Sequence, residues 1–358
     1  MERKLQKLLA AVTPTDRSWF ERARARNADL IMPPRALGRL HDLAERLCAI
    51  QATLTPDIGE RAVLVMAADH GVTAEGVSAF PAEVTPQMVA AFVRGWAGIN
   101  ALAGTARAKV LVADLGVAAD LSGLAAENPS LLIRKIAPGT ANMARGPAMT
   151  RNQARESILT GAELADLAMD QGARLLATGD MGIGNTTAST AIGAVLTGQD
   201  PEALVGPGTG LDRTGLDRKL GVIRRALTVN APDPGDPLDV LAKVGGFEIG
   251  AITGLILAAA ARRTPVVVDG FISTAGALTA AALCPACRDF MFAGHVSAEP
   301  GHAAMLDHLG LSPILALGMR LGEGTGAVLA VSILDAAVAM FTEVKTFEEA
   351  EIGPAVSS

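Results

Sequence analysis

Short apolar runs, each followed by glycine or a polar residue, recur along the middle of the chain. Ala-rich stretches with helical spacing separate most of these runs. Runs of this length are typical of strands that are buried on both faces of a parallel sheet. The pattern predicts an α/β protein with a layered parallel sheet. The predicted strands are AVLVMAA before Asp69, KVLVA before Asp114, ARLLATG before Asp180, PVVV before Asp269, DFMFAG before His295 and PILALG before Met319.

The two ends of the chain carry helical patterns instead. Apolar residues recur at helical spacing between Leu37 and Ile50, and residues 327–341 form a long apolar run near the C-terminus. The chain has 358 residues, which is enough for one large domain and a small one. We therefore expect helical ends around an α/β middle.

Composition narrows the class of function. The net charge is −6, aromatic residues make up 3% of the chain and tyrosine is absent. The chain thus lacks the basic stripe and the stacking platform of a nucleic-acid-binding protein. The charged N-terminus has no signal-peptide pattern, and the apolar run over residues 251–261 is about half as long as a membrane span. We expect a cytoplasmic protein with small-molecule partners, and neither nucleic acid nor a membrane.

Two groups of residues have the chemistry of metal ligands but not the arrangement. Cys284 and Cys287 form a CPAC motif without the second pair that a zinc ribbon needs, so we expect reduced thiols. His295, Glu299 and His302 would share one face of a helix, but a Pro-Gly pair interrupts the helix between the last two. We expect no metal site and no cofactor.

The segment TGDMGIGNTTAST, residues 178–190, joins a predicted strand to a predicted helix. Asp180 ends the strand, and Gly182, Gly184 and Asn185 follow. Glycines let the backbone approach a ligand closely, and the start of a helix offers free N–H groups and a partial positive charge. The segment predicts an anion-binding site at the carboxyl edge of the sheet.

A second glycine cluster, VGPGTGLD, contains Gly208 and Gly210 and precedes a basic helical stretch. Lys219 lies nine residues beyond Gly210, where a helix could aim its ammonium group at a phosphate. A flexible loop before a basic helix is the alternative interpretation of the same residues.

The third cluster, GMRLGEGTGA, places Glu323 between two glycines just before an apolar helix. If the surrounding cleft is apolar, desolvation raises the pKa of this carboxyl toward neutrality, which suits a general base for a weakly acidic N–H. A first-turn acid that complements the helix dipole is the alternative, and this cluster alone favours it.

Taken together, six segments in this order resemble the nicotinate-nucleotide:dimethylbenzimidazole phosphoribosyltransferase family, which makes the lower-ligand nucleotide of cobalamin. The resemblance extends from MPPRALGRL near residue 32 to the GEGTGA segment. The segments are ADHGVTAEGVSAFPAEVT, GDMGIGNTTAST, VGPGTGLD, DGFISTAGAL, HVSAEPGH and LGMRLGEGTGA.

The resemblance implies a reaction and a fold. A dimethylbenzimidazole nitrogen attacks the anomeric carbon of nicotinate mononucleotide with inversion, nicotinate leaves, and Glu323 accepts the azole proton. The implied fold is a Rossmann-like large domain with a parallel sheet flanked by helices, over residues 61–330. A small helical domain comes from residues 1–60 and 331–358, and the molecule is a homodimer.

The resemblance also implies which residues bind the substrates. The residues implied to bind the nucleotide's phosphate and ribose are Gly182, Gly184, Asn185, Gly208, Gly210 and Lys219. The nucleotide side of the site is implied to be lined by Asp269 and Ser297. Asp180 stands at the position of a family carboxylate that binds the substrates. On a looser correspondence, the aromatic base is bound by Ser78, Phe80, Met88 and Leu317.

One departure from the family pattern concerns the acceptor base. The family usually has glutamate where this chain has Asp180, so the carboxylate is retracted by one methylene, about 1.5 Å. This leaves two alternatives beside the main reaction. One is the same transfer to another acceptor, such as adenine, a phenol or a different benzimidazole, and the other is a nucleotide-binding protein without catalysis.

Overall fold

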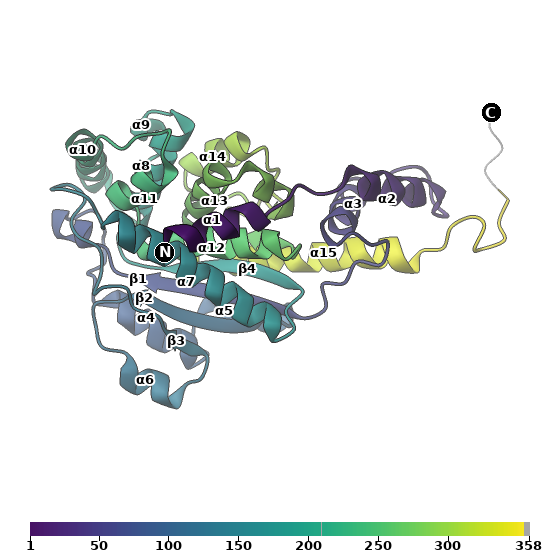
Figure 1. Cartoon of the computed structure of the whole chain (residues 1–358), viewed down its shortest axis with the longest axis horizontal. Coiled ribbons are helices and arrows are strands. Elements are labelled where there is room, and N and C mark those ends of the chain that lie inside the picture. Colours follow the sequence, from purple (N-terminus) through teal and green to yellow (C-terminus); the bar gives the residue numbers. More distant parts are fainter. Residues whose placement is uncertain (209, 354–358) are drawn as a thin grey trace.

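The computed structural model describes residues 1–208 and 210–353 of the chain. Its centre is a parallel sheet with the strand order β3-β2-β1-β4-β5-β6. The helices α7, α12 and α13 pack on one face, and α4, α5 and α15 pack on the other (Figure 1). The strands are β1 (Arg61–Ala68), β2 (Lys109–Gly116), β3 (Leu131–Ile133), β4 (Leu175–Met181), β5 (Val266–Val268) and β6 (Met291–Ala293).

The predicted α/β class is confirmed, and the strands explain why. Every residue of β1 is buried, and so is every residue of β4 except Met181, as expected for strands with helices on both sides. The strand order runs outward from β1 in one direction and then restarts at β4 in the other. Ligands of such sheets bind at this reversal, beyond the carboxyl ends of the strands.

Five of the six predicted strands are present, and one prediction is wrong. Residues 313–318, PILALG, form no strand, and their part in the sheet is a single parallel bridge between Leu315 and His295. Pro313 has no N–H to donate, and Leu317 is 61% exposed, so this run is not buried as the others are. The edge strand β3 was not predicted. Only Leu131 of its three residues is buried, whereas all three residues of β5 and of β6 are buried.

The described residues also form α-helices around the sheet. They are α1 (Glu2–Ala11), α2 (Arg17–Asp29), α3 (Arg39–Gln51), α4 (Val84–Val93), α5 (Gly98–Thr105), α6 (Ser122–Glu127), α7 (Arg151–Asp170), α8 (Asn185–Thr197), α9 (Pro201–Leu204), α10 (Arg213–Asn230), α11 (Pro237–Val244), α12 (Phe247–Ala261), α13 (Phe271–Leu283), α14 (Gly301–Leu309) and α15 (Thr325–Glu343). Two short 3₁₀ helices, η1 (Gly71–Glu75) and η2 (Pro285–Phe290), complete them.

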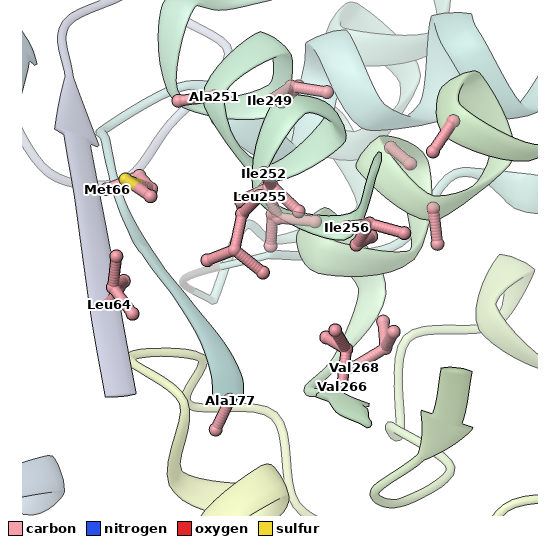
Figure 2. Close-up of a cluster of buried hydrophobic side chains, with 14 of the residues drawn as sticks. Leu64, Met66, Ala177, Ile249, Ala251, Ile252, Leu255, Ile256, Val266 and Val268 are labelled. Carbon is pink, nitrogen blue, oxygen red and sulfur yellow. The ribbon is translucent and has the colours of Figure 1, made fainter. Parts of the chain in front are cut away.

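The core lies between the sheet and the buried helix α12. Figure 2 shows Leu64 and Met66 of β1 beside Ile252 and Leu255 of α12. On its other side α12 lies very close to α7, because a Cβ at Gly254 would collide with the backbone of α7. This tight layer provides the rigid support for the loops at the carboxyl edge.

The two ends of the chain meet beside the sheet. Helix α2 packs on α3, α3 packs on α15, and the three form the extension at the right of Figure 1. A bridge between Leu30 and Thr346 ties the C-terminal segment to the end of α2. Helix α1 lies apart from them, against α7 and α12. The division into two domains at the predicted boundaries stays a prediction.

Among the described residues, α15 is the one helix long and apolar enough to cross a membrane. Over half of its most apolar stretch, 56%, is buried inside the fold, where it contacts α3, α5, β4 and β5. Core helices of globular proteins meet the same test of length and hydropathy, so α15 alone does not indicate a membrane span.

Candidate active site

A cavity of about 610 Å³ opens at the carboxyl edge of the sheet, beside the end of β4. Eight of the predicted site residues line it. They are Phe80, Met88, Asp180, Gly182, Asn185, Gly208, Ser297 and Glu323. The other lining residues are Val84, Met181, Ile183, Thr186, Gly270, Phe271, Ile272, His295, Glu299, Arg320, Leu321 and Gly322. The glycine loops and the predicted base thus face one space.

The remaining predicted residues lie around this cavity without lining it. Gly184 has a φ of 95° and is the residue from which α8 begins. Gly210 and Leu317 are exposed to solvent. The Ser78 hydroxyl accepts the N–H of Phe80 at 3.2 Å. Lys219 and Asp269 are buried behind the loops that form the wall, as described below.

Glu323 lies in an unusual turn directly before α15. Its φ is 64°, and the glycines on either side also have positive φ, 82° at Gly322 and 96° at Gly324. The turn packs flat against β4, because a Cβ at Gly179 would come within 2.5 Å of the Glu323 carbonyl oxygen. Left-handed backbone at a residue other than glycine is costly and is concentrated at functional sites.

The Glu323 carboxyl is almost fully buried, with 5% of the residue exposed. Its Oε2 accepts the backbone N–H of Ile99, at the start of α5, at 3.0 Å. Burial raises the pKa of the carboxyl, and the Ile99 hydrogen bond opposes part of that rise. The carboxyl is therefore held at one oxygen and has an elevated proton affinity, which are the properties of a positioned base.

Asp180 is a second carboxyl in the same cavity. Its Oδ2 accepts the side-chain N–H of Asn185 at 3.1 Å, while its buried Oδ1 has no hydrogen-bond partner in residues 1–208 and 210–353. Burial raises the pKa of Asp180 well above its ordinary value, and the nearby carboxyls of Asp269, Glu248 and Glu323 raise it further. Burial and these neighbouring carboxyls therefore favour the protonated form of Asp180.

The first glycine loop takes its shape from what lies beneath it. A Cβ at Gly182 would collide with the Ala68 carbonyl at the end of β1. The Ile183 N–H donates to the Thr85 hydroxyl at 3.1 Å, and no side chain caps the start of α8. The helix therefore presents an uncapped N-terminus beside the cavity, which is a favourable place for an anion.

Lys219 braces the two glycine loops from behind. It is fully buried, and its Nζ donates to the Thr186 hydroxyl at 2.8 Å and to the Gly206 carbonyl at 3.0 Å. Burial lowers its pKa to about 8, against the attraction of Glu299. Glu299 in turn accepts the Gly208 N–H at 3.1 Å. Lys219 thus contacts residues of the cavity wall and brings a positive charge close behind it.

Arg320 is a functional candidate that sequence reasoning missed. Among the described residues that line the cavity, it is the one lysine or arginine. Its Nη1 donates to the Gly208 carbonyl at 3.2 Å, so the guanidinium reaches across to the second glycine loop. Its place in the motif LGMRLGEGTGA, three residues before Glu323, was the available signal.

His295 and Glu299 also line the cavity, but they do not form a metal site with His302. Nδ1 of His302 accepts the Ser297 N–H at 2.7 Å, and its Nε2 then donates to the Thr274 hydroxyl at 2.8 Å. Burial lowers the pKa of His302 to about 3, so this imidazole is neutral. Within the part of the chain that the structure describes, no group of three His, Cys, Asp or Glu side chains is arranged to hold a metal.

A parallel sheet with glycine loops, an uncapped helix start and a buried carboxyl around one cavity defines an enzyme of phosphorylated substrates. The comparisons make this specific. A family model described as phosphoribosyltransferase matches residues 12–352. The chain belongs to the nicotinate-nucleotide–dimethylbenzimidazole phosphoribosyltransferase family, so the resemblance drawn from its motifs is confirmed.

Relatives of that name are similar over nearly the whole chain. The one from Desulforudis audaxviator is 52% identical over 351 residues, which are 98% of each chain. The one from Syntrophobacter fumaroxidans is 53% identical over 350 residues, again 98% of each chain. The crystal structure of CobT from Thermus thermophilus is 51% identical with a TM-score of 0.90, and it covers 94% of this chain and 100% of that one.

Proposed function

We propose that the chain transfers the phosphoribosyl group of nicotinate mononucleotide to dimethylbenzimidazole, giving α-ribazole 5′-phosphate and nicotinate. The full-length similarity to relatives of that name supports the reaction. The observation that carries the mechanism is the buried Glu323 carboxyl, which is held by the Ile99 N–H and lines the same cavity as both glycine loops.

The bonds change as follows. One azole nitrogen attacks the anomeric carbon on the face opposite nicotinate, and the bond from that carbon to the pyridinium nitrogen breaks. The bonding electron pair returns to the pyridinium ring, which leaves as neutral-ring nicotinate without needing an acid. The other azole nitrogen loses its proton to Glu323. A base is the only proton-transfer group that this sequence of steps requires.

The phosphate belongs at the two glycine loops. The uncapped start of α8 offers N–H groups, and Arg320 offers a charged guanidinium at the rim. Lys219 supports these loops from within. This assignment brings the sugar's anomeric carbon between the loops and the carboxyl pair of Asp180 and Glu323.

Asp180 supports a second candidate, the same transfer to a different acceptor base. Burial raises its pKa well above the ordinary aspartate value, which favours the protonated form, and its Oδ1 has no partner among the described residues. A protonated carboxyl can donate to an acceptor atom on the incoming base, which adenine and several benzimidazoles carry. Competition between dimethylbenzimidazole and a panel of bases separates the two candidates, because the preferred acceptor suppresses the product of the other.

The test of the proposed function is turnover of nicotinate mononucleotide with dimethylbenzimidazole. Release of nicotinate together with a ribosylated base supports it. Tight nucleotide binding without release of nicotinate would instead support a binding protein that lacks catalysis.

We also propose a cytoplasmic homodimer, as the family resemblance implies. Large apolar side chains exposed on the described surface, among them Ile31, Leu37, Phe80 and Trp96, are suited to burial against a second copy. Sedimentation equilibrium of the purified chain tests the dimer.

A further inference from the structure

Asp269 does not face the cavity, although it was predicted to line the nucleotide. It follows β5 and is 1% exposed. Its Oδ2 accepts the Gly324 N–H at 3.2 Å, and its Oδ1 accepts the Ala327 N–H at 2.8 Å. Both oxygens are therefore engaged by the first turn of α15. His295, whose Nε2 lies 3.8 Å from Oδ1, lines the cavity in its place.

The helix that Asp269 caps has no cap of its own. Residue Gly324 stands where a capping side chain would be, and α15 has no side-chain cap from its own sequence. A carboxylate that accepts N–H groups at a helix start satisfies donors that would otherwise be unpaired and complements the helix dipole. Here the cap comes from the residue that follows β5, 55 residues earlier in the chain.

The capped turn is the one that carries Glu323. Three successive residues, 322 to 324, have positive φ, and the middle one is not a glycine. Such a turn persists only when its surroundings hold it. Gly179 supports it from below by lacking a side chain, and Asp269 holds the residue that follows Glu323. Asp269 is itself anchored, since its N–H donates to the Thr178 hydroxyl at 3.0 Å.

We propose that Asp269 is a positioning residue that holds the left-handed turn of Glu323, and so places the Glu323 carboxyl for proton transfer. The inference rests on the proposed function, because it assigns Asp269 a role only through Glu323. A carboxylate suits the task, since each of its oxygens accepts one N–H. An asparagine has one acceptor oxygen, and its NH₂ would point at the other backbone donor.

A double-mutant cycle tests this role. Asp269→Asn should lower kcat on the order of 10–100-fold, because small misplacements of a catalytic group cost this much. The nucleotide dissociation constant, measured by titration calorimetry, should stay within about threefold, since neither carboxylate oxygen contacts the cavity. The double variant Asp269→Asn, Glu323→Gln should be no slower than Glu323→Gln alone, because Asp269 acts only through Glu323.

Asp114 supplies a matched control. It is fully buried at the end of β2, where it accepts the N–H groups of Gly116 at 3.0 Å and Val117 at 2.7 Å. It does not line the cavity among the described residues. Its Oδ2 lies 3.3 Å from the Lys135 ammonium. Asp114→Asn removes this buried carboxylate charge, while the remaining oxygen can still accept both N–H groups, and it should leave kcat within about threefold of the wild type.

Thr178→Val is a second variant in case Asp269→Asn does not fold. It removes the hydroxyl that anchors the Asp269 N–H, so it should lower kcat in the same direction by a smaller factor, again without effect beside Glu323→Gln.

Two outcomes overturn the inference. In the first, the losses from Asp269→Asn and Glu323→Gln multiply. In the second, Asp269→Asn weakens nucleotide binding and leaves kcat unchanged, which makes Asp269 a substrate-binding residue. Normal turnover of Glu323→Gln is a different result, because it removes the proposed base and with it the proposed mechanism.

Discussion

Replacing the carboxyl of Glu323 by an amide isolates its role as a base. Glu323→Gln keeps the size of the side chain and an oxygen that can still accept the Ile99 N–H, so the turn and the cavity should be unchanged. What the variant loses is the ability to take the azole proton. General base catalysis contributes roughly 10²–10⁴-fold, which corresponds to about 3–5 kcal/mol of the activation barrier.

The assay is release of nicotinate at saturating concentrations of both substrates, followed by liquid chromatography across a range of pH. Burial raises the pKa of Glu323, so the acid limb of the wild-type kcat profile should lie above the ordinary glutamate range. The limb should be absent from the variant. Glu343→Gln, at the exposed far end of the same helix, is the control and should behave as the wild type. A Glu323→Gln enzyme with kcat within about threefold of the wild type would refute the assignment.

Three further predictions concern the loops and the buried charges. Lys219→Ala should weaken nucleotide binding, because it removes the ammonium that holds Thr186 and Gly206 behind the cavity wall. Burial lowers the pKa of Lys219 to about 8, so wild-type affinity should fall between pH 7 and 9, and a calorimetric affinity that is flat with pH would contradict this. Arg320→Gln should weaken nucleotide binding and make the affinity less sensitive to salt. The same titration at several salt concentrations measures this, and an unchanged salt dependence would contradict a contact between Arg320 and the phosphate. Burial raises the folded-state pKa of Asp269 to about 7 from an ordinary value of 3.8. Its contribution to the free energy of unfolding is therefore full below pH 4 and is lost as the pH rises to 7. Urea unfolding should show this loss of stability in the wild type but not in Asp269→Asn, and parallel pH curves for the two proteins would contradict it.

The apolar runs predicted most of the sheet correctly, because a strand that is buried on both faces has a continuous run of apolar residues in the sequence. The exception, residues 313–318, has the composition of a strand. Among the described residues, its pairing is confined to one bridge at Leu315 and one backbone hydrogen bond from Ile314 to Ala293, and Leu317 faces solvent. Which apolar run joins a sheet depends on the space left beside the edge strand, and a local pattern does not contain that information. The strand β3 was not predicted because it lies at the edge of the sheet and only Leu131 of its three residues is buried, so its burial signal is weak.

The site was predictable where backbone chemistry decides it. Glycines around Asp180 and Glu323 indicated loops at strand ends, and the structure places both carboxyls in one cavity. The contacts that orient them were not predictable, because they join distant segments. The Ile99 N–H that binds Glu323 lies 224 residues earlier in the chain. In the same way, Lys219 carries the right charge for a phosphate, but packing turns its ammonium toward Thr186 and Gly206 behind the wall.

The most direct test of the central claim is the identity of the product formed from nicotinate mononucleotide and dimethylbenzimidazole without added metal. Nuclear magnetic resonance of the purified product reports both the bond formed and the configuration at the anomeric carbon. We predict a benzimidazole nitrogen bonded to that carbon in the α configuration, with one nicotinate released for each ribosyl group transferred. A β-configured product, or nicotinate released by hydrolysis with no ribosylated base, would contradict it.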